Sequence, residues 1–141
     1  MSSNFIRSKF IEKYGVNKYE EFVLSLYQSF PLKKSLVFWQ EKLLKELCKD
    51  LDIPLIEQEN VHRVFNCCPK HNIELEKDNV LIVDGNKIAD HIQYNIERKL
   101  FPLANVDAPR DLDRFQYPER NAVLYCSCCR EERARQDKLE L

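Results

Sequence analysis

The residues best suited to chemistry are cysteines and a histidine in two short segments far apart in the chain. One segment contains Cys68 and His71 with two residues between them, and the other contains Cys126 and Cys129 at the same spacing. Two intervening residues let a tight turn point both side chains at one ion, while backbone N–H groups of the turn donate to the thiolates. Thiolate sulfur and imidazole nitrogen are common ligands of tetrahedral zinc. The spacing therefore predicts one Cys3His zinc site formed by these four residues.

Neighbouring cysteines compete for two of the four positions. Cys67 would give a Cys-x3-His spacing, and Cys128 would give a Cys-x-Cys spacing, so either could replace a predicted ligand. Asn72 follows the histidine, where a positive φ is often required and where asparagine tolerates it better than most residues. If all four ligands are protein groups, the site is closed. It then contributes folding energy and has no open position for a catalytic water.

Two other interpretations of the cysteines remain open. A strand that runs into Cys126 and Cys129 and is followed by a helix resembles the arrangement of thioredoxin-like dithiols, in which the helix N-terminus lowers a thiol pKa. That interpretation leaves Cys68 and His71 unexplained. The other alternative is that the cysteines are buried and bind nothing.

Composition limits the function classes. The chain has 141 residues, 44% of them hydrophobic, with a net charge of −1, which gives no general attraction to nucleic acid or to an anionic membrane. Only 2 glycines are present, and no glycine-rich phosphate loop occurs. The sequence has no signal-peptide pattern and no apolar run of about 18 residues that would span a bilayer. We therefore expect a cytoplasmic protein whose thiols stay reduced.

Apolar periodicity predicts the elements that must position the cysteines. Four helices are expected before the first knuckle, the third beginning at Pro31 because proline suits the first turn of a helix. A short β-branched run predicts one strand, paired in a hairpin with 73–75 or 87–88. In chain order, the predicted elements are helices over 3–14, 17–30, 31–51 and 57–65, a strand over 80–83, a helix over 86–100, a long loop over 103–120, a strand over 121–125 and a helix over 131–141.

These elements predict an α+β protein. A helical N-terminal region, 1–56, packs as a bundle on a small zinc-ribbon-like domain, 57–141, with short antiparallel strands and a C-terminal helix. His62 and His91 fall in helical patterns with no acid or nucleophile paired to them, so we expect both to be surface or core residues.

About half of the chain carries a recognisable series of motifs. The residues of this series are Phe65, Cys68, His71 and Leu75; Val80, Ile82 and Gly85; Phe101, Pro102 and Ala104; and Tyr125, Cys126, Cys129 and Arg130. The series resembles a group of small, poorly characterised bacterial proteins with a Cys-x2-His and Cys-x2-Cys zinc-knuckle pair. The resemblance implies that Cys68, His71, Cys126 and Cys129 are the metal ligands, and it implies no activity. Asn72 stands where related sequences often have glycine, and Cys67 and Cys128 are additions.

The function that we expect is a non-enzymatic binding or adaptor role. Structural zinc would fix the scaffold, and the long loop or the helical bundle would contact a protein partner. An immunity or effector-associated protein fits this description, although no residue selects it. One alternative is a zinc- or thiol-dependent enzyme that uses a spare cysteine. Another is a nucleic-acid-binding zinc ribbon, which the lack of a basic patch disfavours.

Overall fold

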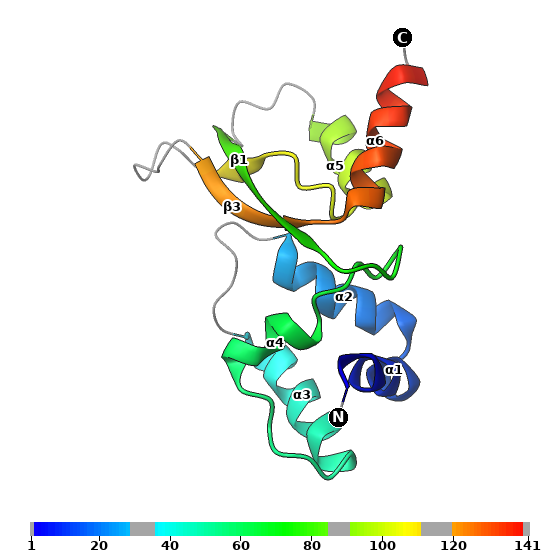
Figure 1. Ribbon diagram of the computed structural model, residues 1–141, viewed down its shortest axis with the longest axis vertical. Coiled ribbons are helices and arrows are strands. Elements are labelled where there is room, and N and C mark those ends of the chain that lie inside the picture. Colours follow the sequence, from blue (N-terminus) through cyan, green and yellow to red (C-terminus); the bar gives the residue numbers. More distant parts are fainter. Residues whose placement is uncertain (1, 29–35, 85–90, 111–119, 140–141) are drawn as a thin grey trace.

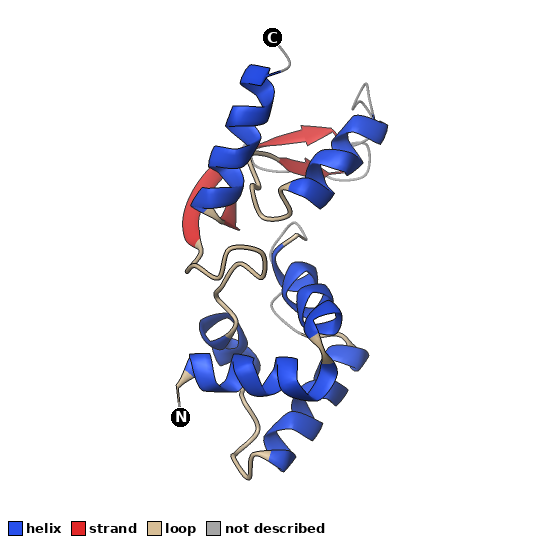
Figure 2. Cartoon of the chain, turned by 90° about the vertical axis from the view of Figure 1, so that its right-hand side faces the viewer, coloured by secondary structure: helices blue, strands red, loops and turns tan. Residues whose placement is uncertain are grey.

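The computed structural model describes residues 2–28, 36–84, 91–110 and 120–139. It is helix-rich with a small sheet, so the predicted α+β class is confirmed. Figure 1 shows the helices of the N-terminal part at one end of an elongated molecule and the sheet with the helices of the C-terminal part at the other. The elements are α1 (Ser3–Tyr14), α2 (Val16–Tyr27), α3 (Phe38–Asp50), α4 (Gln58–Val64), β1 (Glu76–Asp84), α5 (His91–Leu100), β2 (Ala108–Arg110), β3 (Arg120–Tyr125) and α6 (Ser127–Leu139). Figure 2 shows that the described strands lie in the half that contains the C-terminus.

Gly15 separates α1 from α2, as the sequence predicts. Its φ is 91°, a conformation that a residue with a Cβ rarely adopts, and its N–H donates to the Ile11 carbonyl at 2.8 Å. At the other end of α1, the Ser2 hydroxyl accepts a hydrogen bond from the Phe5 N–H and caps the helix. Gly15 is therefore both the C-cap of α1 and the N-cap of α2.

The third helix begins later than predicted. α3 starts at Phe38, so Leu36, which the periodicity placed inside the helix, lies before it. Gln40 accounts for this start, because its side-chain oxygen accepts from the Val37 N–H at 3.1 Å and caps the helix. Gln40 is fully buried, and its amide nitrogen donates to the Ser25 hydroxyl of α2. The predicted start at Pro31 lies outside the described residues.

Three phenylalanines form the centre of the helical half. The ring centroids of Phe10 and Phe22 are 5.0 Å apart, those of Phe22 and Phe65 are 4.9 Å apart, and those of Phe10 and Phe65 are 5.8 Å apart. All three side chains are fully buried. Because Phe65 directly follows α4 and precedes the first knuckle, this cluster ties the helices to the metal-binding segment.

The sheet differs from the predicted hairpin. β1 is the central strand, antiparallel to β3 with Glu76 opposite Tyr125, and parallel to β2 with Ile82 opposite Ala108. Residues 73–75 contribute only an isolated bridge to the first knuckle, and 87–88 lie outside the described residues. A parallel pair needs a crossover connection, and α5 lies between β1 and β2 in the sequence. The predicted antiparallel arrangement therefore holds for β1 and β3, whereas β1 and β2 are parallel.

The segment predicted as a loop is partly ordered core. Leu103 and Ala104 are buried, and 108–110 form β2, whereas 111–119 lie outside the described residues. The Asn105 side chain donates to the Leu124 carbonyl at 2.7 Å and to the Tyr27 carbonyl at 3.2 Å. The segment therefore joins α2 to β3.

The core is continuous between the two halves. One cluster of buried residues contains Phe10 and Leu26 of the helices together with Leu103, Cys126 and Cys129. The division at residue 56 and the zinc-ribbon-like character of the second part stay predictions. Within the described ranges, no helix is long and apolar enough to cross a membrane.

Candidate metal centre

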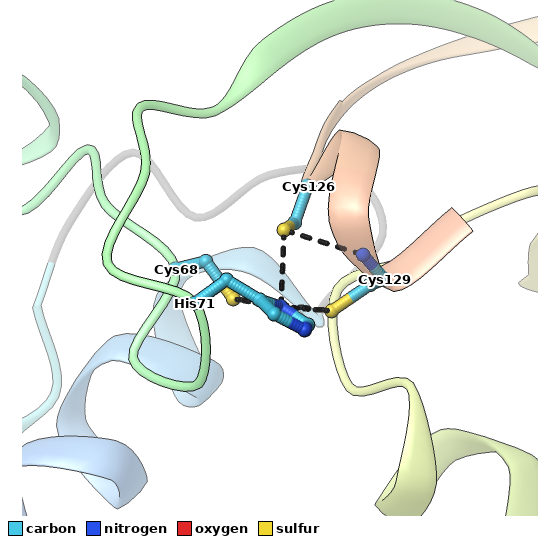
Figure 3. Close-up of side chains that lie close together, drawn as sticks. All are labelled: Cys68, His71, Cys126 and Cys129. Carbon is cyan, nitrogen blue, oxygen red and sulfur yellow. Dashed lines mark hydrogen bonds between the residues drawn. The ribbon is translucent and has the colours of Figure 1, made fainter. Parts of the chain in front are cut away.

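The structure brings together the four residues that the spacing predicts. The ligand atoms of Cys68, His71, Cys126 and Cys129 all lie within 4.8 Å of one another. Figure 3 shows the four side chains converging from two segments, the turn between α4 and β1 and the junction of β3 with α6. The predicted clustering is confirmed, and these four groups could hold a metal ion.

Four of the six distances between these ligand atoms match those around a tetrahedral ion, and the other two are within 4.8 Å. Cys68 Sγ lies 3.8 Å from Cys129 Sγ, and His71 Nδ1 lies 3.6 Å from Cys68 Sγ. The same nitrogen is 3.4 Å from Cys126 Sγ and 3.5 Å from Cys129 Sγ. An ideal tetrahedral zinc with bonds of about 2.3 Å to sulfur and about 2.0 Å to nitrogen separates its ligands by about 3.8 Å (S–S) and about 3.5 Å (S–N). An ion of this size fits with little movement of the side chains.

The first knuckle is shaped by backbone hydrogen bonds. The Cys68 N–H donates to the Ile73 carbonyl at 2.9 Å, and the Asn72 N–H donates to the Cys68 carbonyl at 2.8 Å. Asn72 has a φ of 55°, which confirms the positive φ expected after His71. The turn therefore points both side chains toward the same side.

The second knuckle is the N-terminus of α6. The Cys126 N–H donates to the buried Leu103 carbonyl at 2.8 Å, and the Cys129 N–H donates to Cys126 Sγ at 3.4 Å. The predicted donation from a backbone N–H to a cysteine sulfur is therefore present. The positive end of the helix dipole also favours a thiolate at this position.

Glu132 orients the histidine. Its Oε1 is 2.6 Å from His71 Nε2, and its Oε2 accepts from Lys70 Nζ at 2.8 Å. The hydrogen bond from Lys70, and to a lesser extent that with His71, lowers the pKa of Glu132 to about 2. A carboxylate on the outer nitrogen fixes the imidazole so that Nδ1 faces the three sulfurs, as around many metal-binding histidines. Glu132 is not among the residues predicted for the site, although it lies three residues after Cys129 and therefore on the same side of α6.

Without a metal, the cluster favours one thiolate. The hydrogen bond from the Cys129 thiol lowers the pKa of Cys68 to about 5, against burial, with help from backbone N–H groups of the knuckle. Burial raises the pKa of Cys126 to about 11. The pKa of Cys129 is raised above its usual range, first by its hydrogen bond to Cys68 and then by burial. A cation would therefore replace the protons of Cys126 and Cys129.

The two competing cysteines lie outside the cluster. Cys67 is buried, and its Sγ lies 3.3 Å from the Asn72 side-chain oxygen. Cys128 is half-buried and packs at the edge of the hydrophobic core. The geometry thus favours Cys68 over Cys67 and Cys129 over Cys128. That Cys68 and Cys129 bind a metal stays a prediction.

His62 lies outside the cluster. His62 packs its ring against Tyr27, with 5.5 Å between the ring centroids, as expected for a core residue. The side chain of His91 lies outside the described part of the chain.

Arg130 fixes α6 against the sheet beside the cluster. Its guanidinium donates to the carbonyls of Ala104 at 2.7 Å and Asn105 at 2.9 Å, and to the Asp78 carboxylate at 2.9 Å. The same group stacks over the Tyr125 ring at 3.6 Å. These contacts hold the second knuckle in register with β1.

Comparison with known proteins gives no relative for this arrangement. No protein-family profile, no curated protein and no solved structure matches the chain. The resemblance to small bacterial zinc-knuckle proteins therefore stays a prediction, and the argument for function comes from the site itself.

Proposed function

We propose that Cys68, His71, Cys126 and Cys129 bind one structural Zn²⁺ ion in a non-enzymatic binding or adaptor protein. The metal would fix the scaffold that presents a surface to a protein partner. The observation that carries this proposal is the tetrahedral spacing of one nitrogen and three sulfurs.

The types of ligand favour zinc in a structural role. Three thiolates and one imidazole in a tetrahedral arrangement suit zinc, whereas magnesium and calcium prefer oxygen ligands. Structural zinc sites use four protein ligands, and catalytic sites keep one position for water or substrate. The three cysteines are fully buried, and the His71 side chain is only 15% exposed, which leaves little room for a substrate at the ion.

The position of the cluster explains what the ion would stabilise. It would join the turn after α4 to the junction of β3 and α6, two segments separated by 54 residues between His71 and Cys126. Zinc binding to small zinc-finger peptides contributes about 10–16 kcal/mol, all of which is folding energy when the free chain is unfolded. The hydrophobic core of the helical half does not depend on the ion, whereas both ends of the sheet segment are attached to it. We therefore expect metal loss to loosen the C-terminal half first.

X-ray absorption at the zinc edge tests the proposed ligand set. We expect three sulfur neighbours at about 2.3 Å and one light neighbour, the imidazole nitrogen, at about 2.0 Å, with no second light neighbour. A bound water or a fifth ligand would contradict a closed structural site and favour the enzyme alternative. Cys128→Ser serves as the matched control, because it changes a cysteine outside the cluster and should leave the spectrum unchanged.

The adaptor role has a separate test. A protein that co-purifies with the metal-loaded chain in a fixed stoichiometry, and that rebinds it after separate purification, would support the role. If no such partner is found and the purified chain shows turnover that Cys128→Ser abolishes, the enzyme alternative is correct.

A further inference from the structure

A groove lies on the helical half, where α1 and the start of α2 meet the first knuckle. Its volume is about 610 Å³, and the knuckle contributes Pro69 and Asn72 to its walls. Volumes of about 300–1,000 Å³ are typical of small-molecule sites. None of the four groups proposed to bind zinc lines this groove, so it is a separate feature of the fold.

The charged residue of the groove is Arg7, on α1. Its guanidinium donates to the Val64 carbonyl at the end of α4 at 2.6 Å and to the side-chain oxygen of Asn4. These bonds hold the group in place but use only two of its five N–H donors. The side chain is half-buried, and it forms no ion pair with any carboxylate of the described part of the chain.

Among the described residues, no carboxylate lines the groove beside Arg7. The acids nearest in sequence to the lining residues are Glu12, Glu20 and Glu74. Glu12 pairs with Lys9, so these two charges cancel, and Glu20 lines a different cleft, beside α5. Glu74 is exposed and makes no ion pair with Arg7. The groove therefore has a positive charge of its own, although the whole chain carries −1.

The other polar groups of the groove are mainly donors. Asn4 turns its side-chain oxygen to Arg7, since a guanidinium can only donate, and Asn72 turns its side-chain oxygen to Cys67 Sγ at 3.3 Å. Neither amide nitrogen has a hydrogen-bond partner within the described ranges. The exposed hydroxyl of Ser8 can donate as well. These groups suit a ligand that is rich in acceptor oxygens.

Apolar side chains form the rest of the walls. Phe5 and Val16 are 41% and 56% exposed, although both lie on helices that pack into the core. Ile11, Tyr19 and Pro69 line the groove with them. A ligand with an apolar body would remove this surface from water, which is favourable.

We propose that this groove binds a small-molecule carboxylate with an apolar or aromatic body. The carboxylate accepts from the remaining N–H groups of Arg7 and from the amide nitrogens of Asn4 and Asn72, because a guanidinium fork matches carboxylate geometry. One cation balances the single charge of a carboxylate, and the body packs on Phe5 and Val16. This function goes beyond the proposed adaptor role.

The compound 3-phenylpropionate is a suitable probe, because its amide has the same shape and no charge. Titration calorimetry on the metal-loaded full chain should show saturable binding of 3-phenylpropionate at one site. The amide should bind at least about tenfold more weakly, the effect of one charged contact. Acetate, which lacks the apolar body, should not bind at the same concentrations. Absence of saturable binding of 3-phenylpropionate, or equal affinities of acid and amide, would overturn the proposal.

Two matched variants locate the site. Val16→Glu places a carboxylate in the groove and should weaken 3-phenylpropionate binding by at least about tenfold. It should not disturb folding, because Val16 is the first residue of α2 and an acid there favours the helix. Leu55→Glu, at a position that is 51% exposed and outside the groove, should leave the affinity unchanged. Equal affinities of the Val16→Glu variant and the unmodified protein, or equal losses in both variants, would refute this site.

Arg7→Gln tests the role of the cation. It should abolish the preference for 3-phenylpropionate over its amide. If Arg7 only capped α4 at Val64, the substitution would lower stability and leave that preference intact, a result that would contradict the proposal. Metal content measured on the same samples separates failure at the groove from failure of the zinc proposal, since a variant with full metal and no binding counts against the groove alone.

Discussion

Different interactions stabilise the two halves of the molecule. The helical half encloses a fully buried aromatic cluster of Phe10, Phe22 and Phe65, whose ring centroids are 4.9–5.8 Å apart. The sheet half has little comparable packing: among the described residues of β1 and β3, only Val80 and Val123 are buried. Hydrogen bonds of Arg130 and Asn105 and the Cys–His cluster supply what the sheet lacks. The proposed ion would therefore matter most in the half whose described strands bury the least apolar surface.

Of the substitutions considered, Cys126→Ser should reduce stability the most, and the loss should be confined to the half that contains the sheet. Without this thiolate the site loses its metal, and we expect the β1–β3–α6 unit to lose several kcal/mol of stability, by the scale of structural zinc sites. Thermal unfolding followed by circular dichroism, with metal content measured in parallel, tests this. Cys128→Ser should retain both metal and melting temperature. A melting curve that chelator leaves unchanged would contradict the role of the metal.

Phe22→Ala should break the helical half without the metal being involved. Removing a buried aromatic ring typically costs about 3–5 kcal/mol, because it loses transfer energy and leaves a cavity. Denaturant unfolding should show this loss equally with and without added zinc. The control is Phe38→Ala on α3, since Phe38 is 81% exposed and should change stability by less than about 0.5 kcal/mol. A similar loss in both variants would contradict the assigned core.

These two halves also differ in how far the sequence predicts them. Cys68, His71, Cys126 and Cys129 cluster as predicted, because the two-residue spacing constrains each knuckle locally. The pairing of β1 with β3 and β2 depends on contacts between distant segments, which local propensity does not encode. Apolar periodicity predicts a start of the third helix before Phe38, because periodicity contains no information on the cap that the Gln40 side chain makes with the Val37 N–H.

Polar contacts account for most of what the sequence analysis missed. Prolines and charges around Leu103 and Ala104 predict a loop, yet both residues are buried. Asn105 ties this segment to α2 and β3 through its side-chain amide, a contact with no sequence signature. Glu132 was missed for a similar reason, because its partners Lys70 and His71 are more than 60 residues away.

The affinity for zinc should depend steeply on pH. In the metal-free cluster the pKa of Cys126 is about 11 and that of Cys129 lies above its usual range, so both thiols are protonated at pH 7. Cys68, with a pKa of about 5, is already a thiolate. Burial lowers the pKa of His71, but hydrogen bonds to Glu132 and Cys68 raise it above its usual value, so His71 can lose a further proton on binding. Binding therefore releases at least two protons, and affinity should fall by about 100-fold or more from pH 8 to pH 7. Competition with a chromophoric chelator measures this slope, and a flat profile would contradict the assigned protonation states.

Glu132→Gln should have the smallest effect and should sharpen the comparison. The amide can still contact the imidazole but loses the negative charge, so zinc affinity should fall by about 10- to 100-fold while the saturated protein stays folded. Glu131→Gln, at an exposed neighbouring position on α6, is the matched control and should bind zinc normally. Equal affinities of the two variants would show that Glu132 does not orient His71.

Elemental analysis of gently purified protein tests the central claim most directly. The account predicts one zinc ion per chain, lost together in the Cys68→Ser and Cys126→Ser variants although these residues belong to different knuckles. A chain that is fully folded and contains no transition metal would contradict the proposal that an ion joins the two knuckles.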